Sequence, residues 1–265
     1  MTNDNKNIIK EIIETGSEIT GCVGGAVIAG LIPGPVGIVL GGASGPIITK
    51  VFKALGTEIK ERFLSPRESI RIGAAYTFAI NKIKENETKG IPLRKDNFFD
   101  SVDDNRPASE EVLEGIILTS QREFEELKIK YLGNLYANIC SNQDIDKEHA
   151  NQLIKTANSL SFRQFCILQL LNERCIESQE LKFKIRGSEK WEVSLMDIIS
   201  EIRDLQQKGL VFIPTTYDGG DNSSPIQLNK LSITKSGLFF CNTLSLETIE
   251  KEKLNKLNEI TSIKE

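Results

Sequence analysis

The chain has 265 residues, a length of about two domains, of which 26% are charged and 39% hydrophobic. This composition is typical of a globular protein, so most of the chain beyond its first 50 residues is expected to be soluble. The net charge of −4 argues against bulk binding of duplex DNA, although a local basic pocket is compatible with it. The five cysteines are widely spaced and form no C-x-x-C pair, which favours a reducing compartment and structural thiols.

An uncharged run of 31 residues, Ile19–Thr49, contains nine glycines and a Pro33-Gly34-Pro35 interruption near its middle. Small residues recur every four positions on both sides of this interruption. On a helix this spacing places them on one face, so that two backbones can approach closely, as helices do in lipid. The residues predicted to provide this packing and the bend are Gly21, Gly25, Ala29, Pro33, Gly34, Pro35, Gly37, Gly41 and Gly45.

The two arms of the run, Ile19–Ile32 and Val36–Thr49, have 14 residues each. A helix of that length reaches about 21 Å, less than the roughly 30 Å of a bilayer's hydrocarbon core. The central prolines oppose one continuous helix, so a helical hairpin is predicted, with both ends on one side of the membrane. Lysines that follow the second arm, Lys50 and Lys53 among them, place the body in the cytoplasm by the positive-inside rule.

The alternative is a glycine-rich hairpin buried inside a soluble protein or oligomer, because apolar stretches of this length are more often core helices. The two interpretations coexist if a resting oligomer shields the hairpin until activation. A phosphate-binding loop is disfavoured, since the run contains no G-x-x-x-x-G-K-[ST] motif. A secretory signal is disfavoured too, because Glu11, Glu14 and Glu18 stand where such a signal carries positive charge.

The middle of the chain is predicted to be helical. Ser65-Pro66-Arg67-Glu68 has the form of a capping box, which predicts a helix to about Glu85. The stretch 86–105 reads as a loop, in which Arg94, Lys95 and the Phe98-Phe99 pair could meet an anionic ligand. The preferred alternative is that the phenylalanines anchor the loop to the core and the charges stay solvated. From Glu110 to Cys140 the apolar residues recur at helical steps, Phe124 among them.

Six acidic residues of this helical stretch invite a metal or acid–base interpretation: Glu110, Glu111, Glu114, Glu123, Glu125 and Glu126. They are not accompanied by an E-x-x-H motif, and His149 is the only histidine of the chain. Acids in a first helical turn are also favoured by the helix dipole, so a solvated face is the preferred interpretation. No catalytic residue, metal ligand or cofactor is therefore predicted. Asp146 is expected to cap the next helix, with His149 near its first turn.

The C-terminal part alternates helices and strands. Ser161-Phe162-Arg163-Gln164 forms a second capping box, Ser194 is a candidate cap for a later helix, and Gly209 is expected to end that helix. Two β-like runs, 210–214 and 228–234, follow before a helix that opens at Lys235. The tail, 246–265, is predicted to form a charged helix that supports oligomer contacts.

In this part the residues 204–211 resemble the end of the third helix of a winged-helix domain, and 231–237 resemble the exit from its wing. The sequence departs from the winged-helix pattern between Ile176 and Ser194, where it predicts no clear second helix. It implies a third helix that reads the DNA major groove. That helix, 195–208, has a net charge of −1, so it is a poor duplex reader, and protein contacts or ligand sensing are preferred.

If the module binds an oligonucleotide, an alternating basic strip beside a tryptophan is the preferred place, because aromatic rings stack on single-stranded bases. The alternative is an edge strand protected by lysines. The residues of this strip are Lys182, Lys184, Arg186, Lys190 and Trp191.

These observations predict a mainly α fold with segments 1–64 (apolar hairpin), 65–159 (helical domain), 160–245 (winged-helix-like α+β module) and 246–265 (terminal helix). A glycine-zipper hairpin joined to such a body is similar to bacterial antiphage-defence membrane effectors, and to the Hailong type among them. The resemblance implies a homo-oligomeric channel of the inner membrane with a cytoplasmic body, or a cytoplasmic oligomer before activation. It further implies closure by a single-stranded DNA oligomer, or control by a partner protein encoded nearby, and an opening that depolarises the infected cell.

Two other functions remain open from the sequence. The chain could be a winged-helix DNA-binding regulator or adaptor that uses the apolar hairpin for oligomerisation or membrane tethering. An enzyme is the least supported, because the chain shows no paired nucleophile and base, no metal cluster and a single histidine.

Overall fold

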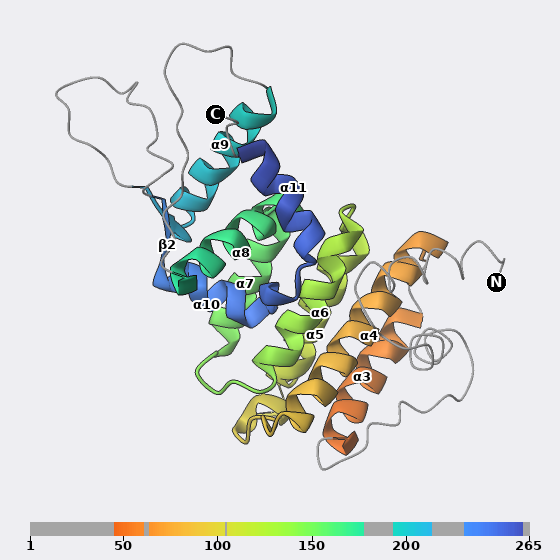
Figure 1. Ribbon diagram of the computed structural model, residues 1–265. Coiled ribbons are helices and arrows are strands. Elements are labelled where there is room, and N and C mark those ends of the chain that lie inside the picture. The colour runs from red at the N-terminus through yellow and green to blue at the C-terminus, as the bar shows by residue number, and fades with distance from the viewer. Residues whose placement is uncertain (1–44, 61–63, 104, 178–192, 214–230, 262–265) are drawn as a thin grey trace, which may run out of the picture. The chain divides into compact units, whose positions relative to one another are not determined.

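The computed structural model describes residues 45–60, 64–103, 105–177, 193–213 and 231–261, and these are mainly helical (Figure 1). The prediction of a mainly α fold is confirmed. The chain divides into two compact units, Met1–Ser159 and Leu160–Glu265. The predicted hairpin lies outside the described residues up to position 44.

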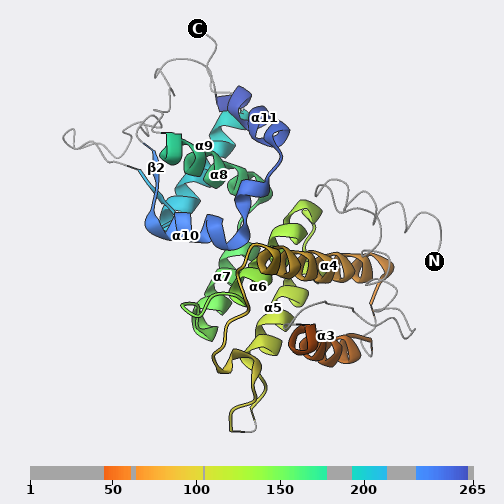
Figure 2. The ribbon, with the colours of Figure 1, turned by 60° about the horizontal axis from the view of Figure 1, so that its bottom comes forward.

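The described part of the first unit is a set of packed helices. Helix α4 contacts α5 and α6, α5 contacts α3, α6 and α7, and α3 lies beside α4 in both views (Figures 1 and 2). The helices are α3 (Gly45–Lys60), α4 (Pro66–Thr88), α5 (Ala108–Arg122), α6 (Ile129–Ile139) and α7 (Lys147–Ser159), with the short 3-10 helices η1 (Asn97–Phe99) and η2 (Glu126–Lys128).

The start of α4 confirms the first predicted capping box. The hydroxyl of Ser65 accepts a hydrogen bond from the backbone N–H of Glu68 at 3.3 Å, and the Glu68 carboxylate accepts one from the backbone N–H of Ser65 at 2.8 Å. Each side chain thereby satisfies a backbone donor that a helix N-terminus leaves free. At the start of α7 the expected cap is also present, since Asp146 accepts a hydrogen bond from the backbone N–H of His149 at 2.7 Å.

Helices α4 and α6 approach each other closely at Gly133. A Cβ atom on this glycine would lie 2.7 Å from the Cβ of Phe78 and 2.8 Å from the backbone oxygen of Ala75. These distances are shorter than van der Waals contact, and one of the obstacles is backbone. Only glycine therefore allows the two helices to pack at this separation.

The predicted helical stretch from Glu110 to Cys140 is wrong as a single helix. Helix α5 ends at Arg122 and α6 begins at Ile129, with η2 between them. Phe124, which the periodicity places on the buried side, is 82% exposed. The apolar periodicity does not reveal the break, because α5 and α6 each bury one apolar face. The junction between them is held by polar contacts, which the spacing of apolar residues does not record.

The phenylalanines of the loop between α4 and α5 are anchored to the core, as the preferred interpretation expected, but its expectation of a solvated charge is wrong for Arg94. The guanidinium of Arg94 is buried, donates to the backbone oxygen of Ile145 at 2.7 Å, pairs with Asp96 and lies 4.4 Å from the ring centre of Phe98. Both Phe98 and Phe99 are buried. Arg94 is thus engaged within the fold and is not a ligand-binding group.

The second unit joins helices to a two-stranded antiparallel sheet, in which Val211 pairs with Ile233. The reciprocal hydrogen bonds between Ser161 and Gln164 confirm the second capping box. Gly209 ends α9 with a positive φ of 72°, as expected. The elements are α8 (Phe162–Glu177), α9 (Val193–Gln207), β1 (Val211–Phe212), β2 (Ser232–Ile233), α10 (Lys235–Leu244), η4 (Leu246–Thr248) and α11 (Lys251–Thr261).

One expectation for this unit is wrong, and another stays a prediction. Helix α9 begins at Val193, so Ser194 lies within its first turn and does not precede it. The terminal helix α11 contacts α8 and α9 of the same chain, and its Leu254 and Leu257 are buried there. These two apolar residues therefore belong to the core of the unit, and the contribution of the tail to oligomer contacts stays a prediction.

Gly133→Ala is predicted to destabilise the first unit by about 1–3 kcal/mol or more, because the added methyl group forces the backbones of α4 and α6 apart. Gly115→Ala is the matched control, since its Cβ meets only the end of the Ile154 side chain, at 3.3 Å, and that side chain can move. Urea unfolding of both variants measures the difference. Equal stability of the two variants would contradict the close helix contact.

Candidate functional site

Helix α3 is the place where the glycine-rich run reaches the described structure. The last residues of the run, Gly45–Thr49, form the first turn and a half of α3, and the helix continues to Lys60. Pro46 lies in the first turn, where backbone N–H groups have no partner within the helix, so the N–H that proline lacks is not needed. The run is therefore joined to the first unit by a helix, without an intervening loop after Gly45.

One face of α3 is buried against the first unit. The apolar residues on it recur at helical spacing and are at most 2% exposed: Ile48, Val51, Phe52 and Leu55. Gly45 is buried on the same face. The opposite face carries Ile47, which is 42% exposed, and the exposed Lys50. This amphipathic pattern docks α3 on its neighbours.

Phe52 is the centre of this docking. Its ring lies 4.8 Å from that of Tyr76 in α4 and 5.8 Å from that of Tyr136 in α6, both in edge-to-face geometry. Both tyrosines are at most 1% exposed, and burial raises the pKa of Tyr136 well above its usual value. Such aromatic pairs contribute about 0.5–1.5 kcal/mol beyond the area that they bury. Phe52 thus connects α3 to two other helices at once.

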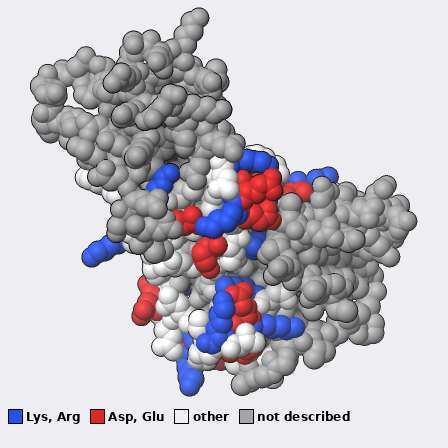
Figure 3. Space-filling view, viewed as in Figure 1, with Lys and Arg blue, Asp and Glu red and all other residues white. Residues whose placement is uncertain are grey.

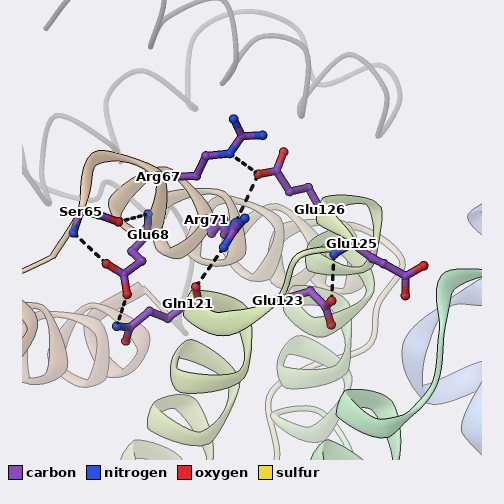
Figure 4. A network of polar contacts seen from close by, with 8 residues as sticks. All are labelled: Ser65, Arg67, Glu68, Arg71, Gln121, Glu123, Glu125 and Glu126. Atoms are coloured by element: carbon purple, nitrogen blue, oxygen red, sulfur yellow. Dashed lines mark hydrogen bonds and ion pairs between the residues drawn. The ribbon is translucent and has the colours of Figure 1, made fainter.

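A polar network lies at the start of α4, a few residues after α3 (Figure 4). Glu126 accepts hydrogen bonds from Arg67 at 2.8 Å and from Arg71 at 3.2 Å. Arg71 also donates to the backbone oxygen of Gln121 at 3.4 Å, and the Gln121 amide donates to Glu68 at 2.9 Å. The network ties the first turns of α4 to the end of α5 and to η2.

Hydrogen bonds to its charged form lower the pKa of Glu68 from 4.5 to about 2. The bond from Gln121 is the largest cause, followed by the bonds from the side chain and backbone of Ser65. A depressed pKa means that the folded state prefers the carboxylate, so ionised Glu68 stabilises the fold.

A buried ion pair lies on the other side of the same junction. The ammonium group of Lys128 is 2.5 Å from the carboxylate of Glu123, and the side chains are 2% and 4% exposed. Lys128 also donates to the backbone oxygen of Asn158 in the last turn of α7 at 3.4 Å. Glu123 accepts in addition from the backbone N–H of Glu125 at 2.9 Å (Figure 4).

In the second unit, the acidic side chains of α9 turn out to have intramolecular roles. Glu201 accepts hydrogen bonds from Ser161 at 2.8 Å and Arg163 at 2.6 Å, and Asp204 accepts one from Gln164 at 2.8 Å. These contacts hold α9 against the start of α8. The net charge of the whole helix therefore does not describe the face that is exposed to solvent.

The exposed face of α9 is polar and nearly neutral. Its members recur at helical spacing, and Met196 is 56% exposed. Asp197 and Arg203 are its exposed charges of opposite sign, while Ser200 and Gln207 are uncharged. The charge argument against duplex reading by this helix is thus weakened, because two of its three acids face α8.

The surface charges are mixed in sign where the described atoms can be seen. On the face shown in Figure 3, basic and acidic side chains lie next to one another. Ion pairs at the surface of the first unit also join charges of opposite sign, such as Arg106–Glu114 at 2.5 Å and Lys147–Glu111 at 3.3 Å. The described part of this face consequently shows no patch of a single sign that would attract a polyanion.

Most of the predicted site residues lie outside the described residues. Of the packing and bend set only Gly45 is described, and all five residues of the basic strip 182–191 fall in a stretch that is not. Phe52 and Lys128 were not predicted as site residues, although the spacing of Phe52 seven residues after Gly45 was an available signal. Glu123 and Glu126 were predicted as part of a solvated acidic face, and this is wrong for Glu123, which is buried and paired with Lys128 five residues later.

Three of the four described cysteines are core residues, and the fourth, Cys175, is exposed. Cys140, Cys166 and Cys241 are buried and free, and burial raises the pKa of Cys140 and of Cys241 to about 12.

Within the described ranges, no group of three or more His, Cys, Asp or Glu side chains could hold a metal ion. In the same ranges, no helix has the length and apolarity required to cross a membrane.

Comparisons with known proteins add no relative. No protein-family model, no curated protein and no solved structure matches this chain.

Glu68→Gln is predicted to lower stability most above pH 4.5 and progressively less as the pH falls towards about 2. The carboxylate has its lowered pKa only in the folded state, so its contribution is complete above the unfolded pKa and is lost as the folded group becomes protonated. Urea midpoints of both proteins from pH 2 to pH 7 measure this. Gln121→Leu, which removes the main donor to Glu68, should show the same pH dependence. A constant difference across the range would contradict the role of the carboxylate.

Proposed function

We propose that this chain is a subunit of a self-assembling membrane pore, in which the glycine-rich run is the membrane-active hairpin and the helical body controls it. The observation that carries the proposal is that the uncharged run continues directly into α3, whose apolar face is docked on the body through Phe52. A change in the body that displaces α3 would act on the run without a flexible connection after Gly45.

The register of α3 supports this role of the glycines. Gly45 lies on the buried face of the helix together with Ile48 and Phe52. On a helix that extended in the N-terminal direction, Gly41 and Gly37 would follow at steps of four and fall on the same face. Ala43 would point about 160° away from both Gly41 and Gly45, whereas Gly42, three residues before Gly45, would lie near the row. The small-residue face of the second arm would thus be aligned with the face that docks on the body.

The resemblance to antiphage-defence membrane effectors suggests the setting of such a pore. The assembled subunits would open the bacterial inner membrane, depolarise an infected cell and stop its growth. The body would lie in the cytoplasm, where it would respond to an oligonucleotide ligand or a partner protein. In the resting state the hairpin would be shielded in an oligomer, which agrees with the ordinary composition of the rest of the chain.

Gly41→Leu is predicted to reduce dye efflux from liposomes by about tenfold or more, because a bulky side chain in the glycine row blocks close helix packing. Ala43→Leu is the control, because it adds a bulky side chain on the opposite side of the same predicted helix, and it should keep most of the efflux. Efflux is measured with and without short single-stranded DNA. Silence of the natural protein under both conditions, or equal loss in the two variants, would contradict a glycine-packed pore.

A second candidate function, a winged-helix regulator or adaptor that binds DNA, is favoured by the exposed face of α9. The intramolecular contacts of Glu201 and Asp204 leave Arg203 on a face that is otherwise polar, and the antiparallel strands β1 and β2 follow this helix as a wing would. This function would use the glycine-rich run for oligomerisation or membrane tethering only.

If this second function holds, Arg203→Glu is predicted to weaken duplex binding by about tenfold or more, because a phosphate or base contact of α9 is replaced by repulsion. Arg122→Glu makes the same charge change on the exposed end of α5 and should leave binding unchanged. Fluorescence anisotropy with a labelled duplex at two salt concentrations measures both. Equal weakening in the two variants would indicate an effect of net charge alone, and would contradict recognition through α9.

A further inference from the structure

We infer that the α5–α6 junction, Glu123–Lys128, is a mechanical relay that couples the last turn of α7 to the start of α4 and thereby to α3. The chain passes into its second unit directly after α7, and α3 continues the glycine-rich run. Only the consequence of the relay, that α3 acts on the glycine-rich run, rests on the proposed function. The coupling itself is a property of the first unit.

One side of the relay is the buried contact of Lys128. Its ammonium group binds the carboxylate of Glu123 at 2.5 Å and the backbone oxygen of Asn158 at 3.4 Å. Lys128 is 2% exposed, so this charge cannot exchange its protein partners for water without opening the fold. A movement of the last turn of α7 must therefore be accommodated by Lys128 and by the turn that carries it.

The other side of the relay is the contact of Glu126. This residue lies in the same single turn as Lys128, the 3-10 helix η2, and it binds Arg67 and Arg71 of α4 (Figure 4). The carboxylate and the guanidinium of Arg71 are 19% and 17% exposed, so this pair is shielded from most of the solvent. A displacement of η2 therefore changes the position of the first turns of α4.

The turn between the two sides is short and stiff. Glu123 accepts from the backbone N–H of Glu125 at 2.9 Å, and the backbone N–H of Lys128 donates to the oxygen of Glu125 at 2.9 Å. These two hydrogen bonds close the segment from Glu123 to Lys128 on itself. The relay requires that this turn moves as one body when one of its sides is displaced.

This position also accounts for the break in the helical pattern. A continuous helix from α5 into α6 would need no buried ammonium group, and apolar side chains could fill its place at no loss of stability. The chain instead keeps two charges in the core at the point where α4, α5, α6 and the end of α7 are brought together.

The test is hydrogen exchange of the full chain, with one end of the relay perturbed and the other end observed. Glu126→Gln removes the charge that binds both arginines and keeps the shape of the side chain. We expect it to raise the exchange rates of α3 and also of the last turn of α7 by about tenfold. Glu114→Gln is the matched control. It breaks the surface pair between Glu114 of α5 and Arg106, and it should alter neither segment.

The same substitution is then made in a chain whose relay is cut without leaving an unpaired charge, Glu123→Leu with Lys128→Met. In that background Glu126→Gln should still raise exchange in α3 but no longer in the last turn of α7. An unchanged α7 in the natural background, or an equal change in both backgrounds, overturns the relay, since independent sites add. Hydrogen exchange is measured without a membrane, whereas the pore is tested by dye efflux from liposomes. The relay can therefore fail while the proposed pore function holds, and the reverse.

Discussion

The close approach of α4 and α6 at Gly133 is the constraint on which the described part of the first unit depends. This contact brings the backbone of α6 against Ala75, and therefore brings Tyr76 of α4 and Tyr136 of α6 to the same side of the pair. The two rings form the surface on which Phe52 packs. A wider separation of the helices would leave a gap beneath Phe52, and α3 would lose the contacts that hold it.

Two kinds of interaction hold α3 and its surroundings, and they respond differently to a perturbation. The docking of α3 is apolar and non-directional, so its free energy falls gradually with lost contact area. The contacts at the start of α4 and at the α5–α6 junction are directional, and those of Lys128 and Glu123 are buried. Since a buried charge demands a partner, this second group transmits displacement, whereas the first group determines how easily α3 leaves the body.

In the second unit the same distinction changes how a charged helix is understood. The acids of α9 seemed, when counted along the chain, to oppose contact with phosphate. Two of them, Glu201 and Asp204, are used to hold the helix against the start of α8. What a partner meets is the exposed side, on which Asp197 and Arg203 carry opposite charges. The function of this helix depends on that face and not on its net charge.

The sequence by itself determined the local features of the fold, because these depend on neighbours along the chain. The capping boxes at Ser65 and Ser161, the cap at Asp146 and the end of α9 at Gly209 were all predicted and are all present. The hydrophobic pattern also predicted a mainly α chain. Only the tertiary structure decided the break at Phe124, the packing of α11 within its own unit and the partners of Lys128, Glu126 and Phe52. Apart from Glu123, which lies five residues before Lys128, those partners lie more than twenty residues away along the chain. No periodicity within one segment records which distant side chain a buried charge or an aromatic ring will meet.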